Sequence, residues 1–246
     1  MKVLIRKFII CLILGIMAMV LFSVMVKAKI IVINEFFVNR EKDIIGVDVS
    51  EYQHDIDMAV LKEQGIQFVI IRATEGSHYV DEKFRVNWKN AHEAQLVCGA
   101  YHFFSFDSPG ATQAANFVAA VGDLQGDLIP VVDVEFYGSR FDNPPEKEDV
   151  VRELQRYLTV LEKRYGVKPM IYASRDIRKN YLEGSFDDYP YWIRNVYYPA
   201  HVSYGRDWTI WQYRDTAILE GYCGGEKYID MDVLNSRYDL TDIMVP

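Results

Sequence analysis

Two carboxylates separated by one residue form the pair in this sequence best suited to chemistry. Asp133 and Glu135 follow the apolar residues 128–132. In an extended strand they point to the same face, about 6–7 Å apart at Cα. Burial and mutual repulsion would raise one pKa, as a general acid requires, and would be costly without a use or a partner. The pattern predicts an acid–base site; a loop cap, or a salt bridge with Arg72 or Arg140, explains the same residues.

Aromatic and polar residues occur near the ends of other apolar runs, where they would surround such a pair. Flat aromatic rings stack on the apolar faces of sugars, and paired carboxylates among aromatic rings are typical of glycosidase sites. A lone histidine is more often a core residue, but His102 adjoins Tyr101 and is included with it. The predicted sugar-binding residues are Glu75, Tyr101, His102, Trp192, Trp211, Gln212 and Tyr213.

Other common catalytic arrangements do not occur in the sequence. The five histidines show neither HxxxH nor HExxH spacing, so no metal or other cofactor is expected. Ser50 lies in no G-x-S-x-G motif, and the cysteines form no Cys/His/Asn arrangement. The three cysteines, Cys11, Cys98 and Cys223, are too few for a disulfide framework.

Eight short apolar runs predict the strands that would position these residues. They cover residues 44–50, 68–74, 98–104, 128–135, 169–174, 191–197, 208–213 and 228–234. Helical spacing occurs at 55–64, 81–95, 111–121, 146–165 and 174–182. Alternating strands and helices predict a closed parallel α/β barrel of the TIM type, with its site at the carboxyl ends of the strands. The connections 197–208 and 213–228 show little helical periodicity, so we expect loops or hairpins there.

The charge is divided unequally along the 246 residues, whose formal net charge is −8. Residues 1–29 contain five basic residues and no acid, which leaves a balance of −13 on the other 217. This acidic excess argues against binding nucleic acid. The hydrophobic share of 50% excludes general disorder.

Residues 8–26 contain nineteen consecutive uncharged residues, enough for a helix to span a hydrocarbon core of about 30 Å. Basic residues before the run place the N-terminus in the cytoplasm. The run exceeds the length typical of signal peptides, which favours an uncleaved anchor over cleavage near Ala28. We therefore predict a membrane anchor or signal segment (1–29), a short stalk (30–43) and an extracytoplasmic catalytic barrel (44–246), held at the cell membrane or secreted after cleavage.

An ordered set of motifs resembles the glycoside hydrolase family 25 lysozymes, or Chalaropsis-type muramidases, over residues 44–240. The motifs are GVDVSEYQHDID (46–57), FVIIRATEG (68–76), GAYHFF (99–104), PVVDVE (130–135), PMIYAS (169–174), YWIRNVY (191–197), IWQY (210–213) and YIDMDVLN (228–235). The resemblance implies an irregular (β/α)5β3 barrel. It also implies hydrolysis of the β-1,4 bond between N-acetylmuramic acid and N-acetylglucosamine in peptidoglycan glycan strands.

The resemblance further assigns roles to four carboxylates: Asp48, Asp133, Glu135 and Asp230. Glu135 would protonate the leaving oxygen. Asp133 would stabilise the developing positive charge or orient the N-acetyl group of the substrate, and the other two would hold this pair in position. Tyr101, Trp211, Gln212 and Tyr213 look like subsite residues.

The sequence departs from the family pattern at a few positions. Asp232 stands where the family often has Asn, and Arg72 stands where many members have Lys. Arg194 and Val196 replace the commoner residues of the W-I-A-x-Y motif, which would alter a subsite.

Two other readings of the same residues are a non-catalytic glycan-binding barrel and a chitinase-like endo-N-acetylglucosaminidase. Retention of all four carboxylates argues against the first. The chitinase pattern D-x-x-D-x-D-x-E lacks its middle acid here, because Val131 occupies that place.

Overall fold

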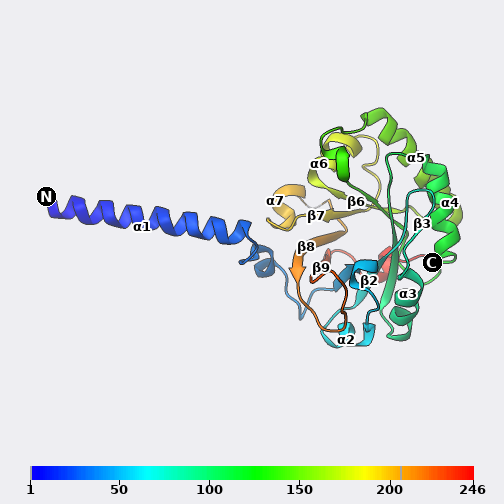
Figure 1. The fold of residues 1–246 in the computed structure, drawn as a ribbon, viewed down its shortest axis with the longest axis horizontal. Coiled ribbons are helices and arrows are strands. Elements are labelled where there is room, and N and C mark those ends of the chain that lie inside the picture. Colours follow the sequence, from blue (N-terminus) through cyan, green and yellow to red (C-terminus); the bar gives the residue numbers. More distant parts are fainter. Residues whose placement is uncertain (1, 206) are drawn as a thin grey trace.

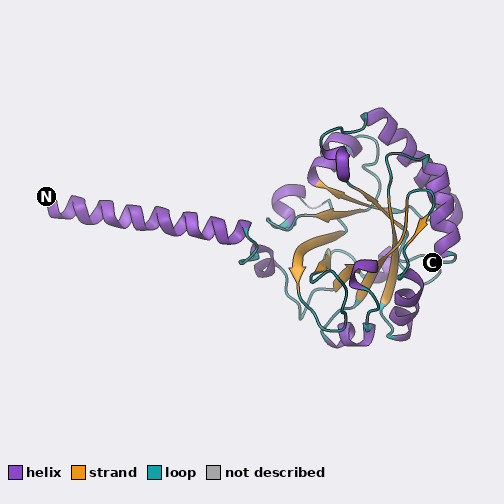
Figure 2. Ribbon diagram, in the orientation of Figure 1, coloured by secondary structure: helices purple, strands orange, loops and turns teal. Residues whose placement is uncertain are grey.

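Eight β-strands close into a barrel in the computed structural model of this chain, which describes residues 2–205 and 207–246 (Figures 1 and 2). The barrel strands are β1 (Ile45–Val49), β2 (Phe68–Glu75), β4 (Val97–Phe103), β5 (Val131–Val134), β6 (Met170–Ser174), β7 (Tyr191–Arg194), β8 (Ile210–Ala217) and β9 (Ile229–Leu234). The short strand β3 (Tyr79–Val80) pairs with β2 outside this ring. The predicted α/β barrel of eight strands is confirmed.

The strand order shows how the ring closes. Strands β1, β2, β4, β5, β6, β7 and β8 run parallel, and β1 pairs with β2. Strand β9 lies between β8 and β1 and is antiparallel to both. The predicted hairpin at the end of the barrel is therefore confirmed. Because β9 is reversed, its first residues lie at the end of the barrel where the parallel strands finish.

Helices connect most successive strands and cover the outside of the barrel. They are α2 (Met58–Glu63), α3 (Phe84–Glu93), α4 (Gly110–Val121), α5 (Lys147–Tyr165), α6 (Arg175–Ile177), which continues into a π-helical turn over Arg178–Leu182, and α7 (Ala200–Tyr204). The 3₁₀ turns are Ile33–Phe37, Glu51–Gln53, Gly138–Phe141 and Leu240–Ile243. The prediction that no helix joins β7 to β8 was wrong at α7, because five residues are too few to show helical periodicity.

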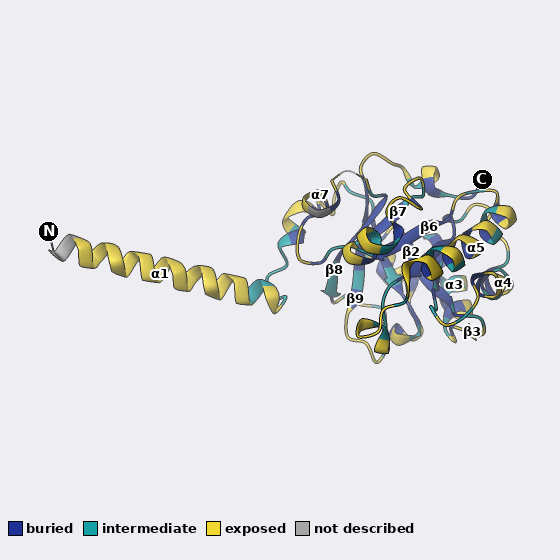
Figure 3. Cartoon of the chain, turned by 90° about the horizontal axis from the view of Figure 1, so that it is seen from above, coloured by how far each residue is buried: buried dark blue, intermediate teal, exposed yellow. Residues whose placement is uncertain are grey.

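The burial of strands and helices explains their sequence patterns. Residues 68–71 of β2 are all fully buried, because the barrel interior covers one face and the helices cover the other. Helix α5 instead buries a single stripe that includes Leu154 and Leu161. It follows two prolines and ends at Gly166, whose φ of 72° is left-handed and suits glycine. Figure 3 shows the buried strands inside the covering helices.

Helices α4 and α5 approach closely at a glycine. A Cβ atom on Gly110 would lie 1.8 Å from the backbone carbonyl oxygen of Glu153, so only glycine fits at the first residue of α4. The Glu153 carboxylate also accepts a hydrogen bond of 3.0 Å from the Gly110 N–H. This contact fixes α4 against α5 on the outside of the barrel.

We expect Gly110→Ala to destabilise the fold by about 2–3 kcal/mol, because the added methyl group must push the two helices apart. Thermal unfolding monitored by circular dichroism measures the effect. Gly225→Ala is the matched control, since nothing lies within 4 Å of its added Cβ. An unchanged melting temperature in Gly110→Ala would show that the close approach is not rigid.

The N-terminal helix α1 (Lys2–Lys27) projects from the barrel beside α7 and β8 (Figure 1). Its residues 5–27 are long and apolar enough to cross a membrane. Residues 30–43, predicted as a stalk, lie partly against the barrel: Asn34 is fully buried and its amide nitrogen donates to the backbone oxygens of Asn195 and Tyr213.

Candidate active site

A cleft of about 400 Å³ opens at the carboxyl end of the parallel strands. The four residues predicted as catalytic, Asp48, Asp133, Glu135 and Asp230, all line it. Asp48 comes from β1, Asp133 from β5 and Asp230 from the reversed strand β9, while Glu135 lies one residue beyond β5. The fold thus gathers acids that are up to 182 positions apart in the sequence.

Asp133 and Glu135 form a coupled acidic pair. Asp133 is 7% exposed, and its Oδ1 has no hydrogen-bond partner among the residues that the structure describes. Burial raises the pKa of both carboxyl groups, and repulsion between the two raises that of Asp133 further. Their mutual repulsion therefore disfavours the state in which both carboxyl groups are ionised.

Gln212 holds the other two carboxylates together. Asp48 and Asp230 are cross-strand partners on β1 and β9. The Gln212 Nε2 donates to Asp48 Oδ2 at 2.7 Å and to Asp230 Oδ2 at 3.3 Å. The Tyr172 hydroxyl donates to Gln212 Oε1 at 3.0 Å, which fixes the orientation of the amide. Burial raises the pKa of both aspartates.

Asp232 lies beneath this network and is fully buried. The Trp192 indole N–H donates to its Oδ1 at 2.8 Å, and a hydrogen bond with Asp48 opposes the effect of burial on its pKa. Burial raises the pKa of Asp232 to about 8. Position 232 departs from the family pattern, which often has Asn there. An asparagine would still accept the hydrogen bond from Trp192 but would carry no ionisable group.

We expect Asp232→Asn to stabilise the protein increasingly as the pH rises from about 4 to about 8. In that range the unfolded chain ionises Asp232 while the folded chain keeps it protonated, so the folded state binds more protons and loses stability with rising pH. The variant should gain a few kcal/mol at pH 8 and almost nothing below pH 4. Urea unfolding across this range measures the difference.

Asp142→Asn is the control for this experiment, because Asp142 is exposed. It should change the stability little at any pH. A stability difference between Asp232→Asn and wild type that does not change with pH would show that folding does not raise the pKa of Asp232.

Two arginines partly compensate the acidic cluster. Arg194 lines the cleft, forms an ion pair of 2.7 Å with Asp215 and lowers the pKa of Glu135. Arg72 lies across the cleft, where its guanidinium contacts Asp81 and Glu51, each at 2.8 Å. Both were noted in the sequence as departures from the family pattern, but their place in the site was not predicted.

Aromatic rings form the walls of the cleft. Trp192 packs edge-to-face against Tyr172 and Tyr101, with ring centroids 4.6 and 6.4 Å apart. Tyr52, Phe103 and Tyr228 also line the cleft. Of these rings, the sequence predicted Tyr101 and Trp192 but not the other four. Tyr172 was detectable in principle, because it lies two residues before the end of the PMIYAS strand.

The comparisons with known proteins agree with this geometry. The family model described as glycosyl hydrolases family 25 matches residues 47–222. The chain belongs to this family. It is therefore a glycoside hydrolase, and the predicted resemblance is confirmed.

A solved structure of a family 25 glycosyl hydrolase from Bacillus anthracis is 42% identical, with a TM-score of 0.78, and the match covers 85% of this chain and 96% of that one. The Escherichia coli O6:H1 protein YegX is 35% identical over 79% of this chain and 70% of its own length. The N,O-diacetylmuramidase of a Chalaropsis species is 29% identical over 78% of this chain and 96% of its own length.

Within this family 25 barrel, His102 is not part of the cleft. It neighbours Tyr101 on β4, so its side chain points to the other face of the strand. Its ring nitrogens bond Thr74 Oγ1 at 2.7 Å and Gln113 Oε1 at 3.0 Å, and the ring stacks on Tyr157. Burial lowers the pKa of His102 to about 4. The prediction of a sugar contact is corrected: His102 is a neutral core residue between β4 and the outer helices.

Three other predicted sugar-binding residues also lie outside the cleft lining. Trp211 and Tyr213 flank Gln212 on β8, and because Gln212 points into the cleft, its neighbours point outward. Both are buried. Glu75 lies at the end of β2, 4.0 Å from Arg72, with a half-exposed side chain. Only Tyr101, Trp192 and Gln212 of the predicted set line the cleft.

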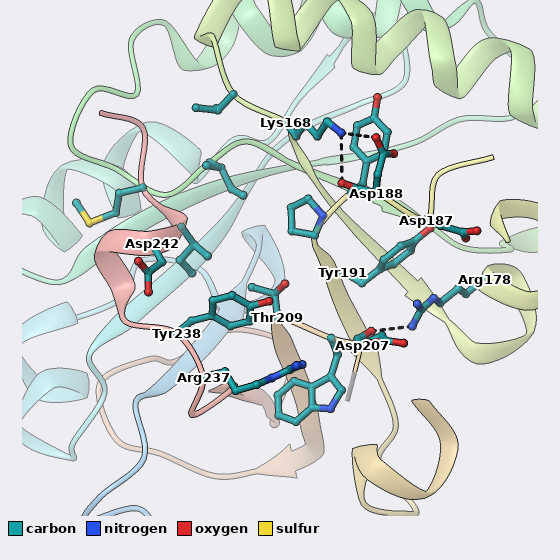
Figure 4. A pocket seen from close by; sticks show the side chains of 17 residues that line it. Lys168, Arg178, Asp187, Asp188, Tyr191, Asp207, Thr209, Arg237, Tyr238 and Asp242 are labelled. Atoms are coloured by element: carbon teal, nitrogen blue, oxygen red, sulfur yellow. Dashed lines mark hydrogen bonds and ion pairs between the residues drawn. The ribbon is translucent and has the colours of Figure 1, made fainter. Parts of the chain in front are cut away.

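A second cavity, of about 490 Å³, lies at the opposite end of the barrel (Figure 4). Its charged groups already contact protein atoms: Lys168 is paired with Asp188, and Arg178 donates to the backbone oxygen of Asp207. Active sites of such barrels lie at the carboxyl ends of the strands. The smaller cleft, with its acidic cluster, is therefore the candidate active site of this family 25 enzyme.

One group of potential metal ligands lies away from the cleft. The potential ligand atoms of His92, Cys98 and Asp127 lie within 4.8 Å of one another. The spacing of these residues in the sequence did not predict this proximity. The His92 Nε2 already contacts Asp127 at 2.8 Å, and burial raises the pKa of the Cys98 thiol, which disfavours the thiolate that a metal needs.

Proposed function

We propose that this family 25 enzyme is a peptidoglycan muramidase, which hydrolyses the β-1,4 bond between N-acetylmuramic acid and N-acetylglucosamine. The observation that carries the proposal is the coupled pair Asp133 and Glu135 in an aromatic-walled cleft. The similarity to the Chalaropsis N,O-diacetylmuramidase supports the choice of substrate.

In this proposal Glu135 is the general acid. A group that protonates the leaving glycosidic oxygen must keep its proton near neutral pH. Burial raises the pKa of Glu135 as this role requires, and Arg194 limits the rise. The residue lies just beyond β5, where its side chain lines the cleft.

Asp133 is the proposed partner of the developing positive charge, or of the substrate N-acetyl group. Its Oδ1 has no hydrogen-bond partner among the described residues, so this atom remains available for the substrate. Burial and the charge of Glu135 raise the pKa of Asp133, and Arg72 and Arg194 oppose that rise. Asp48 and Asp230 would hold the site in shape through their shared bonds to Gln212.

We expect Glu135→Gln to lower kcat/KM on purified peptidoglycan at least about a thousandfold, because the amide cannot donate a proton to the leaving oxygen. Release of reducing ends measures the rate. Mass spectrometry of the wild-type products identifies the new reducing-end sugar, which is N-acetylmuramic acid for a muramidase and N-acetylglucosamine for a chitinase-like enzyme.

Glu93→Gln is the control, since Glu93 is an exposed carboxylate on α3, outside the cleft lining. Both variants should melt at about the wild-type temperature and keep wild-type affinity for the wall. Full activity in Glu135→Gln would refute its role. Binding without cleavage by the wild type would instead identify a glycan-binding barrel.

Arg194→Leu should shift both the acidic and the basic limb of the pH–activity profile to higher pH. Arg194 lowers the pKa of Glu135 and of Asp133, so its removal lets both rise. The acid then keeps its proton to a higher pH, and Asp133 ionises only at a higher pH. Profiles of kcat/KM against pH measure the shift, and profiles that coincide with wild type would show that Arg194 does not act on the pair.

We also propose that α1 anchors the enzyme in the cell membrane with the barrel outside the cytoplasm. The helix is long and apolar enough to cross a bilayer, and three basic residues precede its apolar run. Carbonate extraction of membranes and the mass of the mature protein test this. An intact N-terminal segment in the membrane pellet supports anchoring, whereas a soluble chain lacking it supports cleavage.

A further inference from the structure

The chain leaves α1 through a fixed turn. Lys29, two residues after the end of the helix, has a left-handed φ of 55°, and Ile30 N–H returns to the Met25 carbonyl at 2.9 Å. A lysine in this conformation requires support from its surroundings. The support is an ion pair of 2.5 Å between Lys29 Nζ and Asp215 on β8.

The following residues are also attached to the barrel. Besides the two bonds from the buried Asn34, Glu35 forms an ion pair of 2.8 Å with Arg214 on β8. The segment after α1 is therefore fixed to β8 and to the connection between β7 and α7. Its geometry sets how the barrel stands relative to α1 (Figure 1).

Six large apolar or aromatic side chains are exposed around this attachment. Two contacts join the segments that carry them: the Phe37 ring lies 5.7 Å from that of His201, and Lys29 Nζ lies 5.5 Å from the centre of the Tyr197 ring. The six residues are Ile30, Phe36, Phe37, Tyr197, Tyr198 and Val202, with exposures from 39% to 82%. We call this set the juxtamembrane face.

Two acids beside the juxtamembrane face are neutralised by ion pairs. Glu35 is paired with Arg214, and Asp215 is paired with both Lys29 and Arg194. Lys27, at the end of α1, adds a positive charge. Although residues 30–246 have an acidic balance, this part of the surface would not be repelled by anionic lipid headgroups.

We propose that the juxtamembrane face rests in the headgroup region of the bilayer that α1 enters. Aromatic and aliphatic side chains next to a spanning helix are suited to this region. Ile30 follows the last residue of α1 by only three positions, a maximum of about 11 Å, so a spanning α1 brings this face to the membrane surface. The proposal rests on the anchored form of the proposed function.

The position of the catalytic cleft follows from this arrangement. Asp215, which holds Lys29, lines the cleft, and so does its partner Arg194. The cleft therefore lies beside the membrane, and the substrate it reaches is glycan lying close to the bilayer.

The test uses the full-length chain in liposomes of phosphatidylethanolamine and phosphatidylglycerol. Nitroxide labels are placed at Phe36→Cys or Tyr198→Cys after Cys11 and Cys223 are changed to serine, since Cys98 is buried. Phe141→Cys is the matched control, because Phe141 is 70% exposed but follows β5, three strands round the barrel from β8.

Collision of each label with oxygen and with a water-soluble nickel chelate reports its depth. At Phe36 and Tyr198 the ratio of oxygen to nickel collision should be at least threefold that at Phe141. Equal ratios at all three sites would overturn the proposal.

The double variant Phe36→Asp/Phe37→Asp separates this proposal from the proposed function. It should lower the oxygen-to-nickel ratio at Tyr198 to that of Phe141 and leave cleavage of soluble glycan oligomers unchanged. A ratio at Tyr198 that stays high would overturn the proposal. If the wild type cleaves no glycan while the labels still report contact with lipid, the proposed function fails and the docking stands.

Discussion

The crowding of acids at one end of the barrel is the constraint on which the site depends. Asp133 and Asp232 are buried, while Asp48, Asp230 and Glu135 are partly buried beside them. Burial raises the pKa of each of the five. They cannot all be ionised at once. Gln212 and the Trp192 indole donate hydrogen bonds to two of the acids, and two arginines lower the pKa of Asp133. Some of the acids therefore hold protons while others accept hydrogen bonds. Residues that line the cleft therefore stabilise the acids as well as forming a surface for the sugar.

Much of this arrangement was predictable because strand patterns are local. The eight apolar runs predicted the barrel strands. The D-x-E pair predicted the acidic end of the barrel, since residues i and i+2 of a strand share a face. The resemblance to the family added Asp48 and Asp230, which lie far from that pair in sequence.

The errors in the predicted site also have a physical origin. Neighbouring strand residues face opposite ways, and only the sheet register tells which of Tyr101 and His102 points inward. The same ambiguity affected Trp211 and Tyr213. The pair of Arg194 with Asp215 joins two strands through ionic side chains, and no local pattern predicts such a contact. Helix α7 was too short to leave a periodic signal.

The reversed strand β9 has a consequence for when the enzyme becomes active. The network of Asp48, Gln212 and Asp230 joins the first barrel strand to the last two. Contacts so distant in sequence form slowly during folding, because a long loop must close first. A partly synthesised chain contains Asp48 but not yet Asp230, so the barrel stays open and the acids stay apart. The acidic site therefore forms only after the last barrel strand has paired with the first.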